Sequence, residues 1–389
     1  MLKLGVIGYG GRIQGMVNII ESLRAGAQLV AITDVRNDEI RRQMRARGRN
    51  PDDIAFFTEA DEMLDQMALD GALVGTRCSL HSAMAQKVLR RNLPLFLEKP
   101  VATTMTDLLA LKQAGEDSAG RVVVSFPLRV TPLAQLAKQI IDSGQIGTVE
   151  HVQAYNNVPY GGVYYHYWYR DESETGGLWL QKATHDFDYI NYLLGIQPRW
   201  ISAMMSKQVF KGDHPAGLAC KDCPEERVCP ESPYTLWLAG EINSPDNPPW
   251  EPYLCSFAVD TGNEDSGSAL IEYETGMHVS YSQNFFARRG AATRGATLLG
   301  YRGALQFDWY TDEVKVHMHH TPRVETHRVD SKALSHGGGD TALAQSFIDV
   351  MRGASESVAP LEAGLLSVLM CLKAKQSAQT RSFQAVAWD

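Results

Sequence analysis

The sequence predicts an α/β protein with a parallel, helix-covered sheet first and a mainly antiparallel sheet after it. Three observations lead to this fold class. Short apolar runs alternate with helical patterns over roughly the first 125 residues, and longer, half-polar strand patterns replace them afterwards. The chain also has 389 residues, which is more than one ordinary hydrophobic core organises. We therefore expect a first domain at 1–125 and a second at 126–389.

The first domain is predicted from apolar runs of the kind found in buried parallel strands. These runs lie at 4–7, 29–32, 55–57, 72–74, 95–97 and 122–124. Helical spacing separates them, as in Ile13, Met16 and Ile20 after the first run and in residues 81–90. Strands that alternate with helices indicate crossover connections and hence a parallel sheet.

The second domain is predicted to begin with a helix at 132–143, which Gly144 would end. Strand patterns with polar residues at alternate positions follow, as in antiparallel sheets that have one solvated face. They lie at 149–155, 269–273, 278–283, 297–299, 304–307 and 314–317. Residues 206–254 are rich in Pro, Asp and Cys with little periodicity, which indicates an irregular insertion. Two further helices are expected at 342–351 and 361–376.

The composition excludes several classes of partner. Apolar residues make up 44% and charged residues 21%, with a net charge of −8, which is typical of a globular protein. No basic stripe with interleaved aromatic residues is present, so we expect no nucleic-acid partner. No apolar stretch approaches the roughly 20 residues that span a bilayer, and the N-terminal residues lack a signal-peptide pattern. We therefore expect a cytoplasmic protein without a membrane partner.

A glycine-rich turn, Gly8-Tyr9-Gly10-Gly11, separates the first strand from the first helix. Glycine lets the backbone turn tightly and approach a pyrophosphate, and the helix N-terminus offers unpaired N–H donors. The turn therefore predicts a dinucleotide site. Ile13 stands where a third Gly or Ala is usual, which would loosen the packing of helix on strand or shift the fit by one residue through Gly11.

The end of the second strand predicts which dinucleotide binds. Asp34 would accept hydrogen bonds from the ribose hydroxyls and would repel a 2′-phosphate, which favours NAD. Arg36, two residues later, could accommodate NADP, which we expect to be the weaker cofactor. The alternative interpretation of Asp34 is an ordinary helix-capping residue.

The turn Glu98-Lys99-Pro100 follows the fifth strand directly, at the sheet edge where ligands bind in such folds. Together with the glycine turn, Asp34, His81 and His185-Asp186-Phe187-Asp188, it resembles the glucose–fructose oxidoreductase, inositol dehydrogenase and MocA family. Further resemblance lies at 129–132, 143–147, 176–177 and 193–195. The resemblance implies a Rossmann domain followed by an α/β domain with an open, mainly antiparallel sheet. It also implies oxidation or reduction of a sugar, inositol or related polyol at a secondary carbon.

The resemblance makes Lys99 and His185 the catalytic residues. The family usually places an aspartate four residues before the histidine, whereas this sequence has Gln181 there, followed by Lys182. Glutamine orients a hydroxyl but cannot take its proton. The departure leaves His185, or Lys99 or Lys182 with a lowered pKa, as the general base.

The remaining candidates form two sets. An aromatic segment with an arginine suits stacking on a sugar ring, although any one of its aromatic residues could instead pack in the core or in a dimer interface. The candidate substrate-binding residues are Gln181, Lys182, Asp188, Arg129, Tyr165, Trp168 and Arg170, with Tyr160 beside them. The candidate cofactor-binding residues are Gly8, Gly10, Gly11, Arg12, Ile13, Asp34, Arg36, Thr76, His81, Glu98 and Lys99. His336 would lie near the pocket, while helix capping by itself explains Asp340.

Four cysteines fall in or beside the insertion. Cys220, Cys223 and Cys229 form a C-x2-C-x5-C pattern, and Cys255 follows later. Four thiolates fit one tetrahedral structural zinc, which would order a segment with little apolar material. Free thiols and a redox-active Cys220–Cys223 pair are the alternatives. Cys78 and Cys371 are expected to be ordinary buried residues.

These observations favour an NAD-dependent dehydrogenase acting on a carbohydrate or cyclic polyol. One alternative is a glycoside hydrolase that uses bound NAD in a redox cycle of transient oxidation, elimination, water addition and re-reduction. The other is a nucleotide-sensing protein that has lost catalysis. The open second sheet also offers a face for self-association, so we expect a homodimer or homotetramer.

Overall fold

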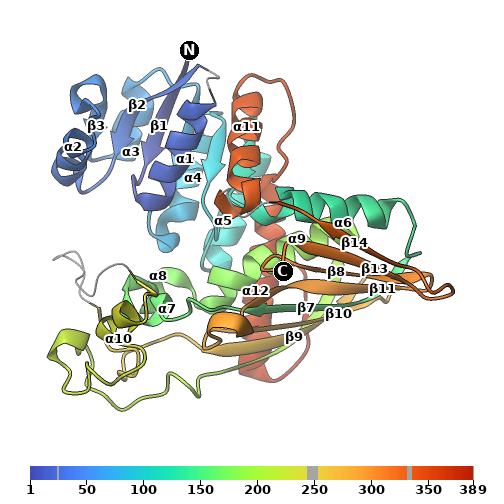
Figure 1. The fold of residues 1–389 in the computed structure, drawn as a ribbon. Coiled ribbons are helices and arrows are strands. Elements are labelled where there is room, and N and C mark those ends of the chain that lie inside the picture. The colour runs from blue at the N-terminus through green and yellow to red at the C-terminus, as the bar shows by residue number, and fades with distance from the viewer. Residues whose placement is uncertain (24–25, 243–252, 331–334, 389) are drawn as a thin grey trace.

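The fold was derived from a computed structural model that describes residues 1–23, 26–242, 253–330 and 335–388. The chain builds two sheets, which lie one above the other in Figure 1. The first sheet is parallel throughout and the second is mixed but mainly antiparallel. The predicted α/β class is therefore confirmed.

The first sheet has six strands in the order β3-β2-β1-β4-β5-β6. The strands are β1 (Leu2–Ile7), β2 (Ala27–Thr33), β3 (Ala55–Phe57), β4 (Gly71–Val74), β5 (Leu95–Leu97) and β6 (Val122–Val124). The connecting helices are α1 (Gly11–Ser22), α2 (Asn37–Ala46), α3 (Ala60–Gln66), α4 (His81–Leu89) and α5 (Met105–Glu116). The strand order reverses next to β1, as in the Rossmann fold, so the glycine turn after β1 lies where such sheets bind dinucleotides.

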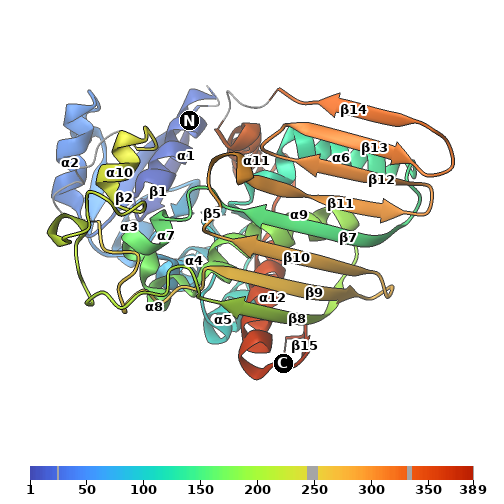
Figure 2. The same ribbon diagram turned by 60° about the horizontal axis from the view of Figure 1, so that its bottom comes forward.

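The second sheet has nine strands in the order β14-β13-β12-β11-β7-β10-β9-β8-β15, of which β7 and β10 run parallel. The strands are β7 (Val149–Asn157), β8 (Pro198–Ser206), β9 (Ser266–Tyr273), β10 (His278–Asn284), β11 (Thr293–Gly300), β12 (Gly303–Asp308), β13 (Glu313–Met318), β14 (Val324–Arg328) and β15 (Gln384–Ala385). The strands β8, β14 and β15 were not expected. In the described part of the chain no helix covers the face that Figure 2 shows, where Met204 and Leu270 are exposed. Self-association through this face remains a prediction.

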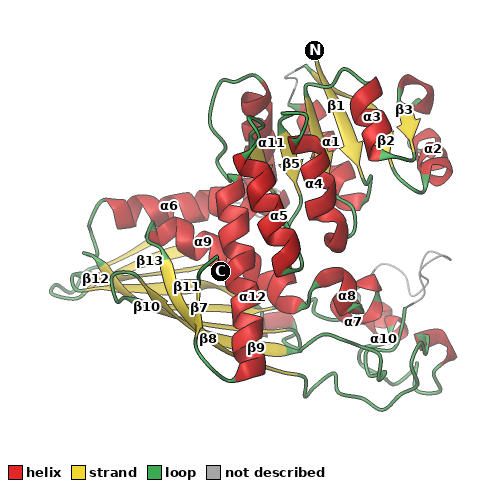
Figure 3. Cartoon of the chain, turned by 180° about the vertical axis from the view of Figure 1, so that it is seen from behind, coloured by secondary structure: helices red, strands yellow, loops and turns green. Residues whose placement is uncertain are grey.

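The other face of the second sheet is covered by helices, as Figure 3 shows from behind. They are α6 (Pro132–Asp142), α9 (Thr184–Leu194) and α12 (Leu361–Thr380). The helix α11 (Gly339–Met351) instead returns to the first sheet, where Phe347 contacts Phe96 of β5 edge to face with 5.8 Å between ring centroids. The proposed domain boundary follows β6, but the end of the chain contributes to both halves.

The insertion runs from the end of β8 to the start of β9. It contains α10 (Pro233–Leu238) and is joined by isolated bridges between His214 and Ala258 and between Ala219 and Leu254. A small separate apolar cluster packs Phe210 and Phe257 of the insertion against the short helix α7 (Val163–His166). A second short helix, α8 (Glu172–Thr175), follows α7 along the chain. None of the helices in the described ranges is long and apolar enough to cross a bilayer.

Candidate active site

The glycine turn has the shape that a pyrophosphate requires. Gly8 has a φ of +84°, and a Cβ there would lie 2.7 Å from the backbone nitrogen of Thr76. Gly10 precedes α1, and within the described residues no side chain caps the N-terminus of that helix. Backbone N–H groups of the first turn therefore remain available for an anion.

Ile13 does not loosen the contact between α1 and the sheet. Its side chain is buried, and it occupies the space above Gly75, where a Cβ would lie 2.1 Å from Cγ1 of Ile13. Ile13 stands at the helix position where the fingerprint usually has Gly or Ala, and Gly75 after β4 provides the space for its larger side chain. Sequence reasoning missed Gly75, since its role depends on a contact between distant segments.

Asp34 lies beside the glycine turn. Its carboxylate accepts the backbone N–H of Tyr9 at 2.8 Å and that of Arg36 at 2.9 Å. The Arg36 guanidinium also approaches it, at 3.3 Å, and is itself half exposed. Asp34, whose charge would repel a 2′-phosphate, and Arg36, whose charge would attract one, therefore lie side by side at the end of β2.

Arg12 joins the glycine turn to two distant segments. Its guanidinium donates to Glu98 at 3.0 Å and to Ser125 at 3.0 Å, and it forms a two-pronged pair with Asp340 at 2.6 and 2.8 Å. His336, which is half exposed, lies 2.7 Å from the same carboxylate. Asp340 is therefore more than the capping residue that the sequence suggested.

His81 forms hydrogen bonds with the backbone beside the Glu98-Lys99-Pro100 turn. It is buried, with Nδ1 2.8 Å from the carbonyl oxygen of Pro100 and Nε2 3.2 Å from that of Thr76. Burial lowers the pKa of His81 below its ordinary value. The side chain therefore links the ends of β4 and β5, and its contact with a cofactor stays a prediction.

Lys99 reaches from this turn toward the second domain. Its Nζ donates to the backbone carbonyl oxygen of Gln181 at 3.0 Å. Burial, and next the charge of Lys182, lower the pKa of Lys99 to about 8. The Gln181 side chain turns away and donates to the carbonyl oxygen of Thr175 at 3.0 Å.

Lys182 is paired with a tyrosine. Both Gln181 and Lys182 lie on a π-helical turn, Trp179–Ala183, which directly precedes α9. Lys182 Nζ donates to Oη of Tyr160 at 2.5 Å. Burial alone would lower the pKa of Lys182, but the phenols of Tyr160 and Tyr164 raise it above its ordinary value. The charge of Lys182 in turn lowers the pKa of Tyr160.

His185 lies in the first turn of α9, close to the charged groups of Lys99 and Lys182. Its ring meets Phe126 edge to face at 5.8 Å, and Nδ1 has no hydrogen-bond partner among the described residues. Burial and the charges of Lys99 and Arg294 lower its pKa well below the ordinary value, so the imidazole is neutral near pH 7. Sequence reasoning missed Arg294, which β11 brings to the site and which donates to the buried Asp186 at 2.8 Å.

The other predicted substrate residues do not form one group. Trp168 lies against the end of β4, with the Arg77 guanidinium 3.9 Å from its ring centroid. Tyr165 is fully buried and donates to the carbonyl oxygen of Glu264 at 2.7 Å. Arg170 pairs with Asp260 in the insertion at 2.5 Å.

Arg129 and Asp188 bind each other. The guanidinium donates to the carboxylate at 2.6 and 3.0 Å, and both side chains are buried. The pair joins the residues that follow β6 to α9. Contact of either side chain with a substrate stays a prediction.

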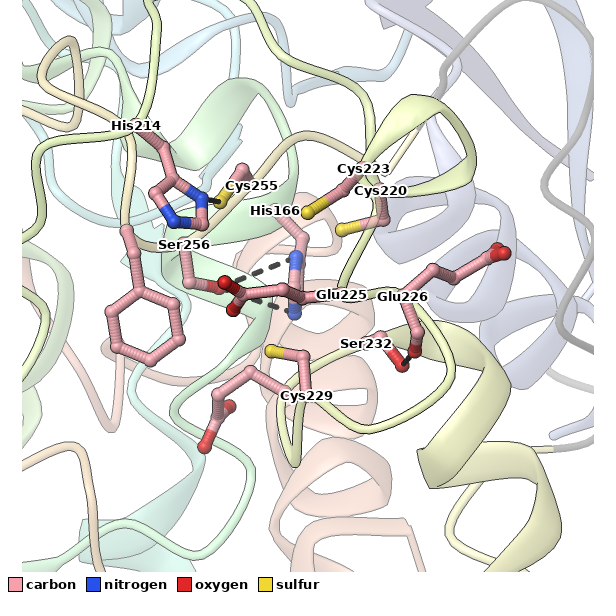
Figure 4. A pocket seen from close by; sticks show the side chains of 12 residues that line it. His166, His214, Cys220, Cys223, Glu225, Glu226, Cys229, Ser232, Cys255 and Ser256 are labelled. Atoms are coloured by element: carbon pink, nitrogen blue, oxygen red, sulfur yellow. Dashed lines mark hydrogen bonds between the residues drawn. The ribbon is translucent and has the colours of Figure 1, made fainter.

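The expected structural zinc is not supported. Cys220, Cys223, Cys229 and Cys255 all line one cavity (Figure 4), but no three His, Cys, Asp or Glu side chains of the described chain are placed to hold one metal ion. A tetrahedral zinc with Zn–S bonds of about 2.3 Å needs sulfur atoms about 3.8 Å apart. All six cysteines are free thiols, and Cys78 and Cys371 are buried as expected.

Comparisons with known proteins agree with this architecture. A family model described as "Oxidoreductase family, NAD-binding Rossmann fold" matches residues 2–126, and the GFO/IDH/MocA C-terminal domain model matches residues 134–306. The protein YteT of Bacillus subtilis (strain 168), which is named as an oxidoreductase, is 27% identical, and the match covers 79% of each chain. The scyllo-inositol 2-dehydrogenase (NAD(+)) of the same bacterium is 25% identical over 51% of this chain and 54% of its own.

Solved structures show the same fold. Levoglucosan dehydrogenase in complex with NADH and levoglucosan has a TM-score of 0.76 at 17% identity, over 99% of both chains. An oxidoreductase domain protein from Kribbella flavida has a TM-score of 0.79, also at 17% identity and 99% coverage of both chains. Because the two family models together span most of the sequence, this chain belongs to the GFO/IDH/MocA family of NAD-binding oxidoreductases.

Proposed function

We propose that this enzyme oxidises a secondary hydroxyl group of a sugar, an inositol or a related polyol, with NAD as the oxidant. The observation that carries the proposal is the meeting of Lys99, Lys182 and His185 beside the carboxyl edge of the parallel sheet. Relatives named as inositol dehydrogenases support the substrate class, although they align with only about half of the chain.

The residues of the first domain fit NAD. A Cβ at Gly11 would meet nothing within 4 Å, and no side chain of the described residues caps the start of α1, which leaves room and backbone N–H donors for a pyrophosphate. Asp34 stands where the ribose hydroxyls would lie, and its negative charge disfavours a 2′-phosphate. When bound, NAD supplies the carbon that accepts a hydride, so the chain itself has to hold the substrate and remove a proton.

Lys99 is the best general base among the three that the sequence left open. Its lowered pKa leaves part of the population as the neutral amine near pH 7, which can take the proton of a substrate hydroxyl at Nζ. Lys182 has a raised pKa and stays an ammonium, which suits a hydrogen-bond donor to substrate oxygens. His185 is neutral and lies near both lysines, so its imidazole can orient the reacting hydroxyl.

The test is an NAD-reduction assay across monosaccharides, inositols, sugar acids and glycosides, repeated with NADP. We expect NADH release in proportion to the substrate oxidised, and a loss of about 100-fold or more in Lys99→Met. Lys112→Met on α5, whose ammonium group pairs with Glu116 of the same helix, serves as the matched control. Glycoside cleavage without net NADH would establish the redox-cycle hydrolase instead. Unchanged activity in Lys99→Met would remove Lys99 from the mechanism.

A further inference from the structure

Positive charge gathers where the proposed active site meets the second domain. Lys99 follows β5, Lys182 lies on the π-helical turn before α9, and Arg294 belongs to β11. The charge of each one lowers the pKa of His185, so all three act on one small region. The fold therefore brings three cationic side chains from distant segments to the same place.

Two carboxylates lie close to these cations, and both already have partners. Glu98, which precedes Lys99, accepts from the Arg12 guanidinium at 3.0 Å. Asp186 accepts from the Arg294 guanidinium at 2.8 Å. The charge of Arg294 is therefore balanced within the protein, and neither carboxylate is left over for the lysines.

Lys182 lacks such a counter-ion. Across the described parts of the chain no carboxylate pairs with Lys182 or Lys99, and the nearby acids pair with arginines. Nζ of Lys182 donates to Oη of Tyr160 at 2.5 Å and lies 4.4 Å and 5.3 Å from the ring centroids of Tyr160 and Tyr164. Phenol oxygens and ring faces offer only partial negative charge, whereas a buried ammonium is ordinarily paired with an anion. The charge of Lys182 is therefore incompletely neutralised.

The ammonium group of Lys182 also has room to bind a ligand. Lys182 is buried, but its partner Tyr160 is half exposed, so the pair borders on solvent. An ammonium has three N–H donors, which allows Lys182 to hold the phenol and still donate to an oxygen atom of a ligand.

The charge balance indicates what that ligand carries. Lys99 has to lose its proton to act as the base, so Lys182 holds the positive charge that lacks a counter-ion within the described site. A carboxylate supplies one negative charge, whereas a phosphate group carries close to two near pH 7. Given the oxidation proposed above, on which this step rests, we propose that the polyol is a sugar acid and that Lys182 binds its carboxylate.

The test compares ligands that share one configuration and differ in charge. Each sugar of the NAD-reduction assay is measured beside its uronic or aldonic acid, the methyl ester of that acid and the sugar phosphate, all at saturating NAD. We expect the acid to have a KM at least about 10-fold lower than the ester and the parent sugar, since hydrogen bonds to charged groups are the stronger ones. Added salt should raise the KM of the acid but not that of the ester.

Calorimetric binding of the same ligands in the presence of NADH gives a second measurement that needs no turnover. Equal binding of acid and ester would overturn the proposal, and a phenolate at Tyr160 that neutralises Lys182 would give this result. Tighter binding of the parent sugar or of the phosphate, or no binding of any acid, would overturn it as well. Absence of NADH formation with every ligand would contradict the proposed function instead, and calorimetry would still decide whether the acid is preferred.

Variants then assign the preference to Lys182. Lys182→Met should lower the ratio of acid to ester binding by about 10-fold or more, whereas Lys182→Arg keeps the charge and should retain most of the preference. Lys112→Met on α5 is the control and should leave the ratio unchanged. Melting temperatures identify a variant that does not fold, and the ligand comparison on the unaltered chain does not depend on any of them. A preference for the acid that persists in folded Lys182→Met would contradict the assignment.

Discussion

At the scale of single residues, Lys99 sets the expected pH dependence. A base acts only after it has lost its proton, and burial lowers the pKa of this amine to about 8. The kcat/KM for substrate oxidation should therefore rise with pH and level off above about 8. In Lys99→Arg the positive charge remains, but the guanidinium cannot lose its proton in this range. We expect the activity of that variant to fall about 100-fold or more, and its kcat/KM should no longer rise with pH.

The pH–rate profiles of the wild type, Lys99→Arg and the control Lys112→Met check this assignment. The control should reproduce the wild-type profile. If Lys99→Arg keeps the same rise with pH, then a different group titrates and Lys99 is not the base.

We expect Asp34 to control the choice of cofactor. Asp34→Ala removes the acceptor of the Tyr9 N–H and the charge that disfavours a 2′-phosphate. We expect the KM for NAD to rise about 10-fold or more, since hydrogen bonds to charged groups contribute roughly 1.5–3 kcal/mol. The kcat should change little, and the preference for NAD over NADP should fall. Steady-state kinetics with both cofactors measure this, with the exposed Asp38→Ala as control. An unchanged ratio of the two KM values would speak for a capping role of Asp34.

At the scale of elements, the contact between α1 and the end of β4 depends on one glycine. Gly75→Ala would set a methyl group 2.1 Å from Cγ1 of the buried Ile13. Overpacking of this kind costs about 1–3 kcal/mol, so the melting temperature should fall. In an Ile13→Ala background, which is itself destabilised by about 2–5 kcal/mol, Gly75→Ala should cost less, because the two side chains no longer overlap.

Thermal unfolding of these variants is compared with that of Gly15→Ala in the same helix. A Cβ at Gly15 meets nothing within 4 Å, so alanine there should leave the melting temperature unchanged or raise it. A Gly75→Ala protein as stable as the wild type would show that α1 shifts without cost.

The elements differ in how well the sequence predicts them. The strands β4, β5 and β6 are continuous apolar runs that are buried throughout, so composition alone marks them. By contrast, β14 (Val324–Arg328) has no buried residue, and β15 (Gln384–Ala385) is two residues long, so neither has a periodic signal. The helix α9 was not predicted either, since polar and buried residues mix along it and carry the site.

The sequence likewise predicts some parts of the candidate site and not others. Lys99 and His185 follow from local motifs, whereas the Lys182–Tyr160 bond and the Arg12–Asp340 pair join positions 22 and 328 residues apart. A contact across such distances depends on how the two sheets are arranged, and no local pattern records it. The pKa values of Lys99 and Lys182, on which the assignment of the general base rests, depend on the same arrangement.

At the scale of the whole molecule, the Arg12–Asp340 pair ties the beginning of the chain to its last quarter. Asp340 is fully buried at the start of α11, while about a third of the Arg12 side chain is exposed. Asp340→Asn keeps the shape of the side chain but removes its charge, and it should weaken both the docking of α11 and the support of Glu98. We expect a loss of about 2–3 kcal/mol in stability, which is below the full cost of breaking a buried pair because solvent reaches Arg12.

The pH dependence of this loss distinguishes the ion pair from simple packing. Burial alone would raise the pKa of Asp340, but hydrogen bonds from His336 and Arg12 hold it well below the ordinary value. A carboxyl group with a lowered folded-state pKa stabilises the fold above its unfolded pKa of about 4, and this contribution is lost as the pH falls further. The difference in melting temperature between wild type and Asp340→Asn should therefore be constant from pH 6 to 8, in roughly the range where both states are ionised, and should shrink below about pH 4. The exposed pair of Arg121 with Glu356 provides the control, since Glu356→Gln should change little at any pH. A difference that stays the same at low pH would mean that Asp340 holds α11 by its shape and not by its charge.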